Sequence, residues 1–314
     1  MKHASTSQFS KPPAMDGLPA RFRFLLFAAL VFLVPQVTWA GPITIGSIHI
    51  EPAHEVKKFL PLARYLAKQL QSEGIDQGRV VVVESIPQMA ALLREGKADL
   101  YIDSPFTSVA VSRFSGSKFL LRRWKKGLGE YHTVIFVRKD SGVSRLADLK
   151  GKMIAFEEPS SSSGYFLPKM VLVQKGLKLA PKRETTDPVG PDEVGYVLSY
   201  LDETTMVWVL RRKVSAGAMD NQNYPKEAKG NLNSLKSIYE TFSIPRQIVS
   251  YRADLPPKLV ARIKEILLKM DQSEEGRKAL QEFERTAKFD EIPDQAMAPL
   301  LKSMKFIEAE LGLQ

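Results

Sequence analysis

The chain has 314 residues, of which 44% are hydrophobic and 25% are charged, and it contains no cysteine. The lack of cysteine excludes a disulfide-built scaffold, a thiolate metal centre, a thiol nucleophile and a lipid attached to an N-terminal cysteine. A mean hydropathy of -0.16 excludes a protein with many membrane spans, and the composition excludes a wholly disordered chain. The length favours about two domains.

The first 40 residues have the features of a secretory signal. Arg21 and Arg23 precede an uninterrupted apolar run over 24–34, and the small residue Ala40 closes the segment. A basic start, a short apolar core and a small residue at the cut are typical of a signal peptide. The alternative is a retained membrane anchor, which is less favoured because a span takes about 20 apolar residues. We therefore expect residues 1–40 to be removed and the mature protein to lie in a bacterial periplasm.

Export changes the meaning of the positive charge. The formal charge of +10 would suit nucleic acid or another anionic partner. Cleavage after Ala40 removes four basic residues and one acidic residue, so the charge falls from +10 to +7. Nucleic acid is not an expected partner of an exported protein.

The chain after residue 40 begins with an alternation of strands and helices. Apolar residues recur at helical spacing over 54–71, and four consecutive valines over 80–83 predict a strand that is buried on both faces. Short loops between such elements are typical of a parallel α/β sheet. The predicted elements are strands at 43–48, 79–85 and 98–103 and helices at 54–71 and 87–95.

A second α/β module of similar size follows. Its predicted elements are strands at 132–138, 153–156 and 216–219, a helical turn at 146–149, a helix ending at 174, a helix at 191–201 and a mostly helical tail over 256–311 with breaks near Gly276 and Pro293. Two such modules predict two lobes, with a ligand cleft at the carboxyl ends of both sheets.

Residues 157–168 form the most informative segment. It runs from a predicted strand through four serines and a glycine into a predicted helix. The start of a helix presents free backbone N–H groups and the positive end of its dipole, and serine hydroxyls add donors. That combination suits a tetrahedral or carboxylate anion. The alternative is that the serines only cap the helix, and the pattern alone leaves both interpretations open.

This serine segment resembles that of the phosphate, phosphite and phosphonate ABC-transporter substrate-binding family. Nearly the whole chain after residue 40 shares the resemblance, including segments at 46–51, 61–66, 96–100, 137–141, 148–151 and 252–256. The resemblance implies an α/β fold of two lobes, that of the type II periplasmic binding proteins, with the ligand cleft between the lobes.

The order of the elements and the resemblance together predict the lobe boundaries. We expect residues 41–132 and 225–314 to form a discontinuous first lobe and residues 133–224 to form the second. The chain would cross between the lobes near 131–133 and 221–225. The C-terminal helices would return to the first lobe.

The resemblance also implies roles for particular residues. Ser161, Ser162 and Ser163 would hold the oxyanion, and Gly164 would let the backbone approach it. Asp220 lies at the end of a strand that reaches the cleft. It would hold the ammonium group if the ligand were an aminophosphonate.

The chain departs from the family pattern at two places. Asp103 and Ser104 stand where an aromatic residue and a glycine are common, and the acidic segment 190–193 stands where a histidine often follows a glycine. A carboxylate repels a dianion unless a proton or a cation intervenes. We therefore expect a pocket more acidic than a phosphate dianion favours.

Several weaker candidates complete the predicted site. Tyr131 and His132 lie near the first predicted crossing, although a structural histidine is the alternative for His132. His49, His54, Glu51 and Glu55 do not predict a metal site, because the adjacent His54 and Glu55 would diverge on a helix. The predicted ligand-binding residues are Glu51, Asp103, Ser104, Tyr131, His132, Ser160, Ser161, Ser162, Ser163, Gly164, Tyr165 and Asp220.

Three pairs of basic residues, at 57–58, 122–123 and 125–126, are most simply solvated surface. The alternative is that they dock onto a membrane partner. We expect no catalytic residue, no cofactor and no metal.

The leading functional hypothesis is a monomeric periplasmic binding protein that closes around a small oxyanion and delivers it to an inner-membrane ABC permease. A second hypothesis is a sensing module that presents the same closure to a sensor kinase. A third is an enzyme with a loop serine as nucleophile. It is disfavoured because the serine segment has no Gly-x-Ser-x-Gly motif and only His132 lies near the predicted cleft as a base.

Overall fold

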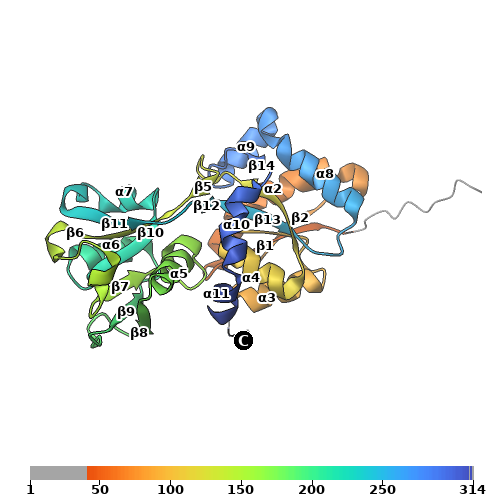
Figure 1. Ribbon diagram of the computed structural model, residues 1–314. Helices are drawn as coiled ribbons and strands as arrows, with labels where there is room; N and C mark the ends of the chain where they lie inside the picture. The colour runs from red at the N-terminus through yellow and green to blue at the C-terminus, as the bar shows by residue number, and fades with distance from the viewer. Residues whose placement is uncertain (1–40, 311, 313–314) are drawn as a thin grey trace, which may run out of the picture. The chain divides into compact units, whose positions relative to one another are not determined.

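The computed structural model describes residues 41–310 and 312, so the predicted signal peptide lies outside the described residues. Two six-stranded sheets organise this part of the chain, and helices pack against both (Figure 1). Among the described residues, no helix combines the length and the apolar composition needed to cross a membrane.

The first sheet has the strand order β14-β4-β13-β3-β1-β2. Its central part is parallel, because β1 pairs in parallel with β2 and β3, whereas β13 is antiparallel to β3 and β4. The strands are β1 (Ile43–Ile48), β2 (Gly78–Val83), β3 (Leu100–Asp103), β4 (Lys118–Arg123), β13 (Gln247–Tyr251) and β14 (Phe289–Asp290). The helices of this half are α2 (Pro52–Gln69), α3 (Ile86–Arg94), α4 (Pro105–Ser115), α8 (Pro257–Leu268), α9 (Glu274–Glu282), α10 (Asp294–Lys302) and α11 (Met304–Glu310).

Strand β2 corrects one sequence-based prediction. Its four valines are only half-buried, whereas the run of valines predicted a strand buried on both faces. β2 is the edge strand of the sheet and pairs with β1 alone among the described strands. Helix α2 packs against β2 and buries Phe59, Leu62 and Leu66. Four β-branched residues therefore form an edge strand here, because β propensity does not report how many neighbours a strand has.

The second sheet has the strand order β11-β6-β10-β7-β9-β8. Strands β10, β7, β9 and β8 are parallel, and β6 is antiparallel to β10 and β11. The strands are β6 (Thr133–Arg138), β7 (Met153–Phe156), β8 (Lys178–Pro181), β9 (Glu193–Leu198), β10 (Ala216–Asp220) and β11 (Leu235–Glu240). The helices of this half are α5 (Leu167–Gln174), α6 (Asp202–Leu210) and α7 (Asn223–Ala228).

Strand β9 stands where the sequence predicted a helix over 191–201, so that prediction is wrong. The segment pairs in parallel with β7 and β8, and Val194 and Val197 are buried. Gly195 allows the close packing, since a Cβ there would lie 2.6 Å from a methyl of Val189. Valine and tyrosine suit a pleated surface, and the sheet contacts decide the structure of this segment.

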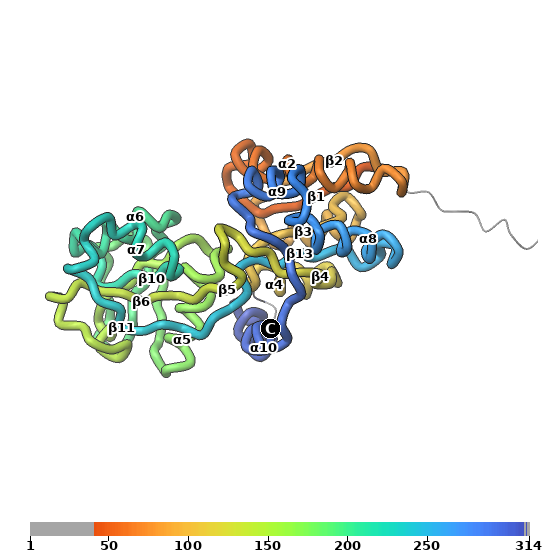
Figure 2. Tube along the Cα trace, turned by 90° about the horizontal axis from the view of Figure 1, so that it is seen from above, coloured from red at the N-terminus to blue at the C-terminus, as the bar shows by residue number. Residues whose placement is uncertain are grey.

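Two short strands carry the chain between the sheets. β5 (Glu130–Tyr131) and β12 (Ile244–Pro245) pair antiparallel, with Tyr131 opposite Ile244 and Glu130 opposite Pro245. Figure 2 shows the yellow chain at β5 and the cyan chain after β11 between the two sheets. The second crossing is therefore at Ile244–Pro245 and not at 221–225. The predicted boundary places β11 in the first lobe, but β11 pairs with β6 of the second sheet, so the chain crosses only after β11.

The C-terminal helices pack on the half of the molecule that holds the first sheet. α8 and α9 contact α2, and α10 and α11 contact α4. The predicted break near Gly276 is present, because α8 ends at Leu268 and α9 begins at Glu274. Gly276 itself lies in the first turn of α9, and its N–H donates to the capping hydroxyl of Ser273 at 3.0 Å.

Candidate functional site

A polar cavity of about 210 Å³ lies at the ends of strands from both sheets. Ser47 and Asp103 come from the ends of β1 and β3, Asp220 ends β10, and Glu157 follows β7. These are the carboxyl ends of parallel strands, where open α/β sheets form their ligand sites. The remaining lining residues are Ile48, His49, Glu55, Lys58, Ser104, Lys125, Lys126, Tyr131, Glu158, Ser160, Ser161, Ser162, Ser163, Asp202, Asn223, Arg246 and Gln247.

The serine turn, defined as residues 160–164, forms one border of this cavity. Ser161 Oγ accepts a hydrogen bond from the N–H of Gly164 at 2.9 Å and caps the helical turn that leads into α5. The N–H of Glu157 donates to the Gly164 carbonyl at 3.0 Å, which holds the turn against the end of β7. A Cβ at position 164 would lie 2.5 Å from the Glu157 side chain, so the turn requires glycine. Ser161 is thus a helix cap, and its hydroxyl proton is still able to serve another acceptor.

Ser162 joins the two halves of the molecule. Its Oγ accepts a hydrogen bond from the backbone N–H of Phe106 at 3.0 Å, in the first turn of α4. Ser104 precedes α4, but its side chain makes no capping hydrogen bond. Ser162 supplies the cap instead, from the half of the molecule that holds the second sheet. Ser162 is only 1% exposed. Ser163 is held in turn by Thr133, whose hydroxyl donates to the Ser163 carbonyl at 2.7 Å.

The acidic wall of the cavity is built on Asp220 and Asp202. Asp220 Oδ1 accepts hydrogen bonds from the backbone N–H groups of Gln222 and Asn223 at 2.8 and 2.9 Å. The Asn223 side-chain amide donates to Asp220 at 3.0 Å and to Asp202 at 2.7 Å. Burial and the nearby charge of Asp220 raise the pKa of Asp202 to about 6.

Two further carboxyls have raised pKa values. Burial and the charge of Asp202 raise the pKa of Glu157, next to the serine turn, to about 8. Burial raises the pKa of Asp103 to about 6, although Asp103 accepts hydrogen bonds from the Ser104 N–H at 2.6 Å and the Tyr101 hydroxyl at 3.0 Å. Glu157 is therefore mostly protonated at pH 7, which lowers the negative charge of the cavity.

Four basic side chains also line the cavity and form its basic wall, which in places lies close to carboxylates. Lys58, Lys125, Lys126 and Arg246 all line the cavity. The ammonium group of Lys125 lies 3.0 Å from a carboxylate oxygen of Glu284, and burial lowers the pKa of Lys125 to about 8. The ammonium group of Lys58 lies 2.9 Å from Glu55.

Arg246 brings the crossing strands into the site. It directly follows β12, and its guanidinium lies over the ring of Tyr131 in β5, 4.3 Å from the ring centroid. The same guanidinium lies 3.8 Å from Asp220. Burial raises the pKa of Tyr131 to about 12, so its hydroxyl is a stable donor at neutral pH.

Three predicted site residues lie outside the polar cavity. Glu51 is exposed at the start of α2, and Glu55, one helical turn later, lines the cavity instead and accepts a hydrogen bond from Ser47 at 3.1 Å. His132 is not among the lining residues, and its ring lies 3.5 Å from the carboxylate of Glu240. Tyr165 lines a different cavity. The other predicted residues border the polar cavity directly or, like Gly164, shape its serine turn.

The sequence did not predict that Lys58, Lys125, Lys126 and Arg246 line the cavity. The prediction of solvated surface is wrong for 122–123 and 125–126, because Arg123 is 0% exposed and Lys125 is mostly covered. Arg123 donates hydrogen bonds to Thr286 and to the carbonyl of Phe283, both at 2.9 Å. These partners lie about 160 residues later in the chain. The only local signal was that the basic pairs continue an apolar strand.

The sequence matches the family model for the periplasmic substrate-binding protein of phosphonate ABC transporters over residues 45–297. The phosphonates-binding periplasmic protein of Escherichia coli is 24% identical over 216 residues, which are 65% of this chain and 60% of that protein. The tetrathionate sensor histidine kinase TtrS of Salmonella typhimurium is 27% identical over 168 residues, which are 52% of this chain and 27% of the kinase. The chain thus spans less than two thirds of the length of either relative.

A solved structure of XAC2383 from Xanthomonas citri bound to chloride superposes on this chain with a TM-score of 0.80. Its sequence is 23% identical, and the match covers 86% of this chain and 98% of that one. The structure of XAC2383 bound to ATP gives a TM-score of 0.79. The family resemblance and the α/β binding-protein fold that the sequence predicted are confirmed.

The cap that Ser162 provides predicts a loss of stability. Ser162→Ala should lower the free energy of unfolding by about 1–3 kcal/mol, because the buried Phe106 N–H loses its acceptor. Urea unfolding followed by circular dichroism measures the change. The matched control is Ser160→Ala, whose half-buried hydroxyl makes no side-chain hydrogen bond within the described residues. Equal stability of the two variants would contradict the role of Ser162.

The raised pKa of Glu157 predicts a dependence of stability on pH. A carboxyl with a folded pKa of about 8 stabilises the fold below its ordinary pKa, and this stability is lost as the pH rises towards 8. Each pH unit in that window costs at most about 1.4 kcal/mol. Glu157→Gln, which stays neutral, should therefore lose less stability than the wild type between pH 5 and 8 in urea unfolding.

Glu95→Gln is the control for this measurement. Glu95 is an exposed carboxyl whose pKa is lowered by Lys97, so it is already ionised throughout the window. Its variant should follow the wild-type profile. A Glu157→Gln profile parallel to that of the wild type would show that Glu157 is ionised in the folded protein.

Proposed function

The chain belongs to the family of periplasmic substrate-binding proteins of phosphonate ABC transporters, and on this premise we propose that it captures a small oxyanion in its polar cavity. The proposed ligand is a phosphonate, phosphite or phosphate. The proposed partner is an inner-membrane ABC permease that receives the ligand from the binding protein. In this proposal residues 1–40 direct the chain to the periplasm, the protein acts as a monomer and no residue is catalytic.

The observation that best supports the proposal is that the serine turn and four basic side chains line the same small cavity. The turn contributes hydroxyl groups, and Lys58, Lys125, Lys126 and Arg246 contribute positive charge around the same cavity. Hydrogen bonds to an ionised oxygen are stronger than those between neutral groups. A cavity of about 210 Å³ also suits a small ligand.

The carboxyl groups of the cavity are compatible with an anion because raised pKa values lower the negative charge of three of them. The carboxyls that line it are Glu55, Asp103, Glu157, Glu158, Asp202 and Asp220. Raised pKa values reduce the charge of Glu157 at neutral pH and bring Asp103 and Asp202 close to protonation. A protonated carboxyl carries no charge and can donate a hydrogen bond to an oxyanion. The carboxyls of the cavity therefore repel an anionic ligand less than their number suggests.

We propose that Asp220 positions other groups and does not hold an ammonium group of the ligand. Both of its oxygens already accept hydrogen bonds, from the N–H groups of Gln222 and Asn223 and from the Asn223 amide. Arg246 also lies 3.8 Å away. A ligand ammonium would have to compete with all of these donors.

Ligand sensing is the second candidate, and the similarity to the sensor kinase TtrS favours it. The cavity would bind its ligand in the same way in both cases, and only the partner would differ. The genes next to this one distinguish the two candidates, since transport requires a permease and an ATPase, and signalling requires a kinase.

The serine turn provides the direct test of binding. Replacement of both Ser161 and Ser163 by alanine should weaken binding by at least about a hundredfold, since each hydroxyl on a charged oxygen contributes about 1.5–3 kcal/mol and 1.4 kcal/mol is tenfold. Titration calorimetry with phosphate, phosphite, methylphosphonate and ATP measures the affinities. ATP is included because XAC2383 binds it.

Ser237→Ala, on the exposed side of β11, is the matched control and should bind like the wild type. Circular dichroism checks that the double variant is folded. Unchanged affinity in a folded double variant would mean that the serines only cap the helix.

A further inference from the structure

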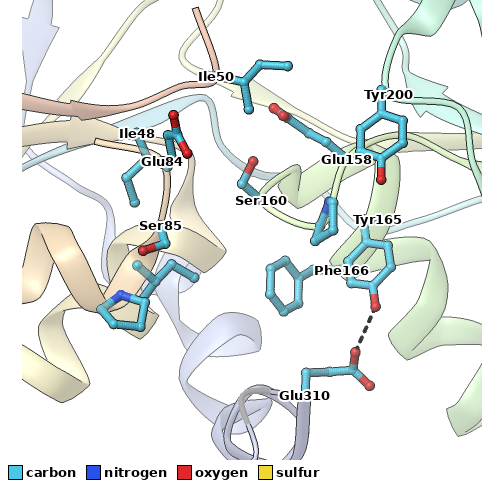
Figure 3. Close-up of a pocket in the computed structure, with 13 residues that line it drawn as sticks. Ile48, Ile50, Glu84, Ser85, Glu158, Ser160, Tyr165, Phe166, Tyr200 and Glu310 are labelled. Carbon is cyan, nitrogen blue, oxygen red and sulfur yellow. Dashed lines mark hydrogen bonds between the residues drawn. The ribbon is translucent and has the colours of Figure 1, made fainter. Parts of the chain in front are cut away.

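An apolar cavity of about 340 Å³, whose lining is drawn in Figure 3, adjoins the polar cavity. The two cavities share Ile48, Glu158 and Ser160 as lining residues. They are therefore neighbouring compartments, and a ligand that extends past Ser160 would enter both. A bare inorganic oxyanion would fill only the smaller one.

The walls of the second cavity are mostly apolar and come from both sheets. Figure 3 shows Ile48 and Ile50 on the side of β1, and Tyr165 and Tyr200 on the opposite side. Ile50 is 59% exposed and Tyr200 is 54% exposed. These two exposed side chains border one apolar cavity together with Ile48, Ile86 and Phe166, and exposed apolar surface that is contiguous in this way can mark a ligand-binding site.

The charged groups of this cavity are acidic. Glu84, Glu158 and Glu310 line it, and none of the described lining residues is basic. An anionic group would be repelled here, whereas the polar cavity next to it holds Lys58, Lys125, Lys126 and Arg246. The two compartments therefore orient a ligand by charge, with its anionic head on the basic side.

Tyr200 is held in a strained backbone conformation. Its φ of 62° lies in the left-handed region, which a bulky residue rarely adopts. The residues on both sides fix it, because the Ser199 hydroxyl donates to the Phe156 carbonyl at 3.0 Å and the Leu201 carbonyl accepts from the Thr205 N–H at 3.0 Å. The chain maintains this strain and presents an exposed aromatic ring to the cavity.

The ring of Tyr165 is fixed as well. Its hydroxyl donates to Glu310 at 3.1 Å and accepts from Lys169 at 2.7 Å, and Lys169 also lies 2.5 Å from Glu310. The ring packs edge-on against Phe166. This wall is preformed, so a ligand would meet it without having to order these side chains.

We propose that the ligand is an organic oxyanion with a neutral alkyl or aryl substituent, whose anionic head occupies the polar cavity and whose substituent occupies the apolar one. This inference rests on the proposed function and narrows its ligand class. Tyr200 and Ile50 would cover the substituent from opposite sides. The apolar area removed from water would increase the affinity over that of the smallest phosphonates.

Titration calorimetry with methylphosphonate and phenylphosphonate tests the inference. The wild type should bind phenylphosphonate at least about tenfold more tightly than methylphosphonate, because the ring buries apolar surface that a methyl group lacks. In the double variant Ile50→Ala/Tyr200→Ala the ratio of the affinity for phenylphosphonate to that for methylphosphonate should fall to about two or three. Leu201→Ala is the matched control, since Leu201 is 61% exposed beside Tyr200 but lines neither cavity, and it should keep the wild-type ratio.

A wild-type ratio near one would overturn the inference, and so would a ratio that survives in the double variant or falls equally in Leu201→Ala. The last outcome would indicate that this exposed apolar surface contacts a protein partner instead. Binding of methylphosphonate without any gain for phenylphosphonate would leave the proposed function standing and remove only this inference. If neither phosphonate binds, the proposed function fails first and the inference fails with it.

Discussion

Glu284 is the carboxylate on which the basic wall of the polar cavity depends. It lies 3.0 Å from Lys125, 3.2 Å from Arg123 and 3.8 Å from Lys58. Burial raises the pKa of Glu284, but these three charges more than offset the effect and hold it at about 2. Glu284 and Arg285 both have φ values near 50°, so a strained turn after α9 presents this carboxylate to the cavity side. Without it, the buried Arg123 and Lys125 would lose the carboxylate that lies beside both of them, which is costly in a protein interior.

Charges of both signs line the same small space. The cations come from α2, from the loop after β4 and from the residue after β12, and four of the six carboxyls come from the half of the chain that holds the second sheet. Glu157 and Asp202 remain on the acidic side with raised pKa values, because they are buried close to other carboxyls. A ligand in the cavity therefore meets four basic side chains together with acids of which Glu157, Asp103 and Asp202 have raised pKa values. Binding an anion in such a place relieves repulsion among the cations and adds hydrogen bonds from the serine turn.

Local sequence was sufficient for most strands and helices and for the serine turn, because a turn between a strand and a helix is built from neighbouring residues. It failed where partners far along the chain decide the outcome. Residues 191–201 form a strand because β7 and β8 flank them, and the valines of β2 are half-exposed because only β1 pairs with that strand. The basic pairs around Arg123 are covered because residues 283–286 fold over them. Glu51 stays exposed because it precedes Pro52, the first residue of α2, whereas Glu55 lies inside the helix and is buried.

The pairing of β5 with β12 also limits how the length of the chain can vary. Tyr131 lies opposite Ile244, and the next residue after β12, Arg246, stacks on the Tyr131 ring. An inserted or deleted residue in either crossing would turn the following side chain to the other face, so that stack and the contact with Asp220 would be lost together. Surface loops such as 183–190 have no such restriction. Insertions in those loops are therefore compatible with ligand binding. Insertions in the two crossings are not, even though only four residues are paired there.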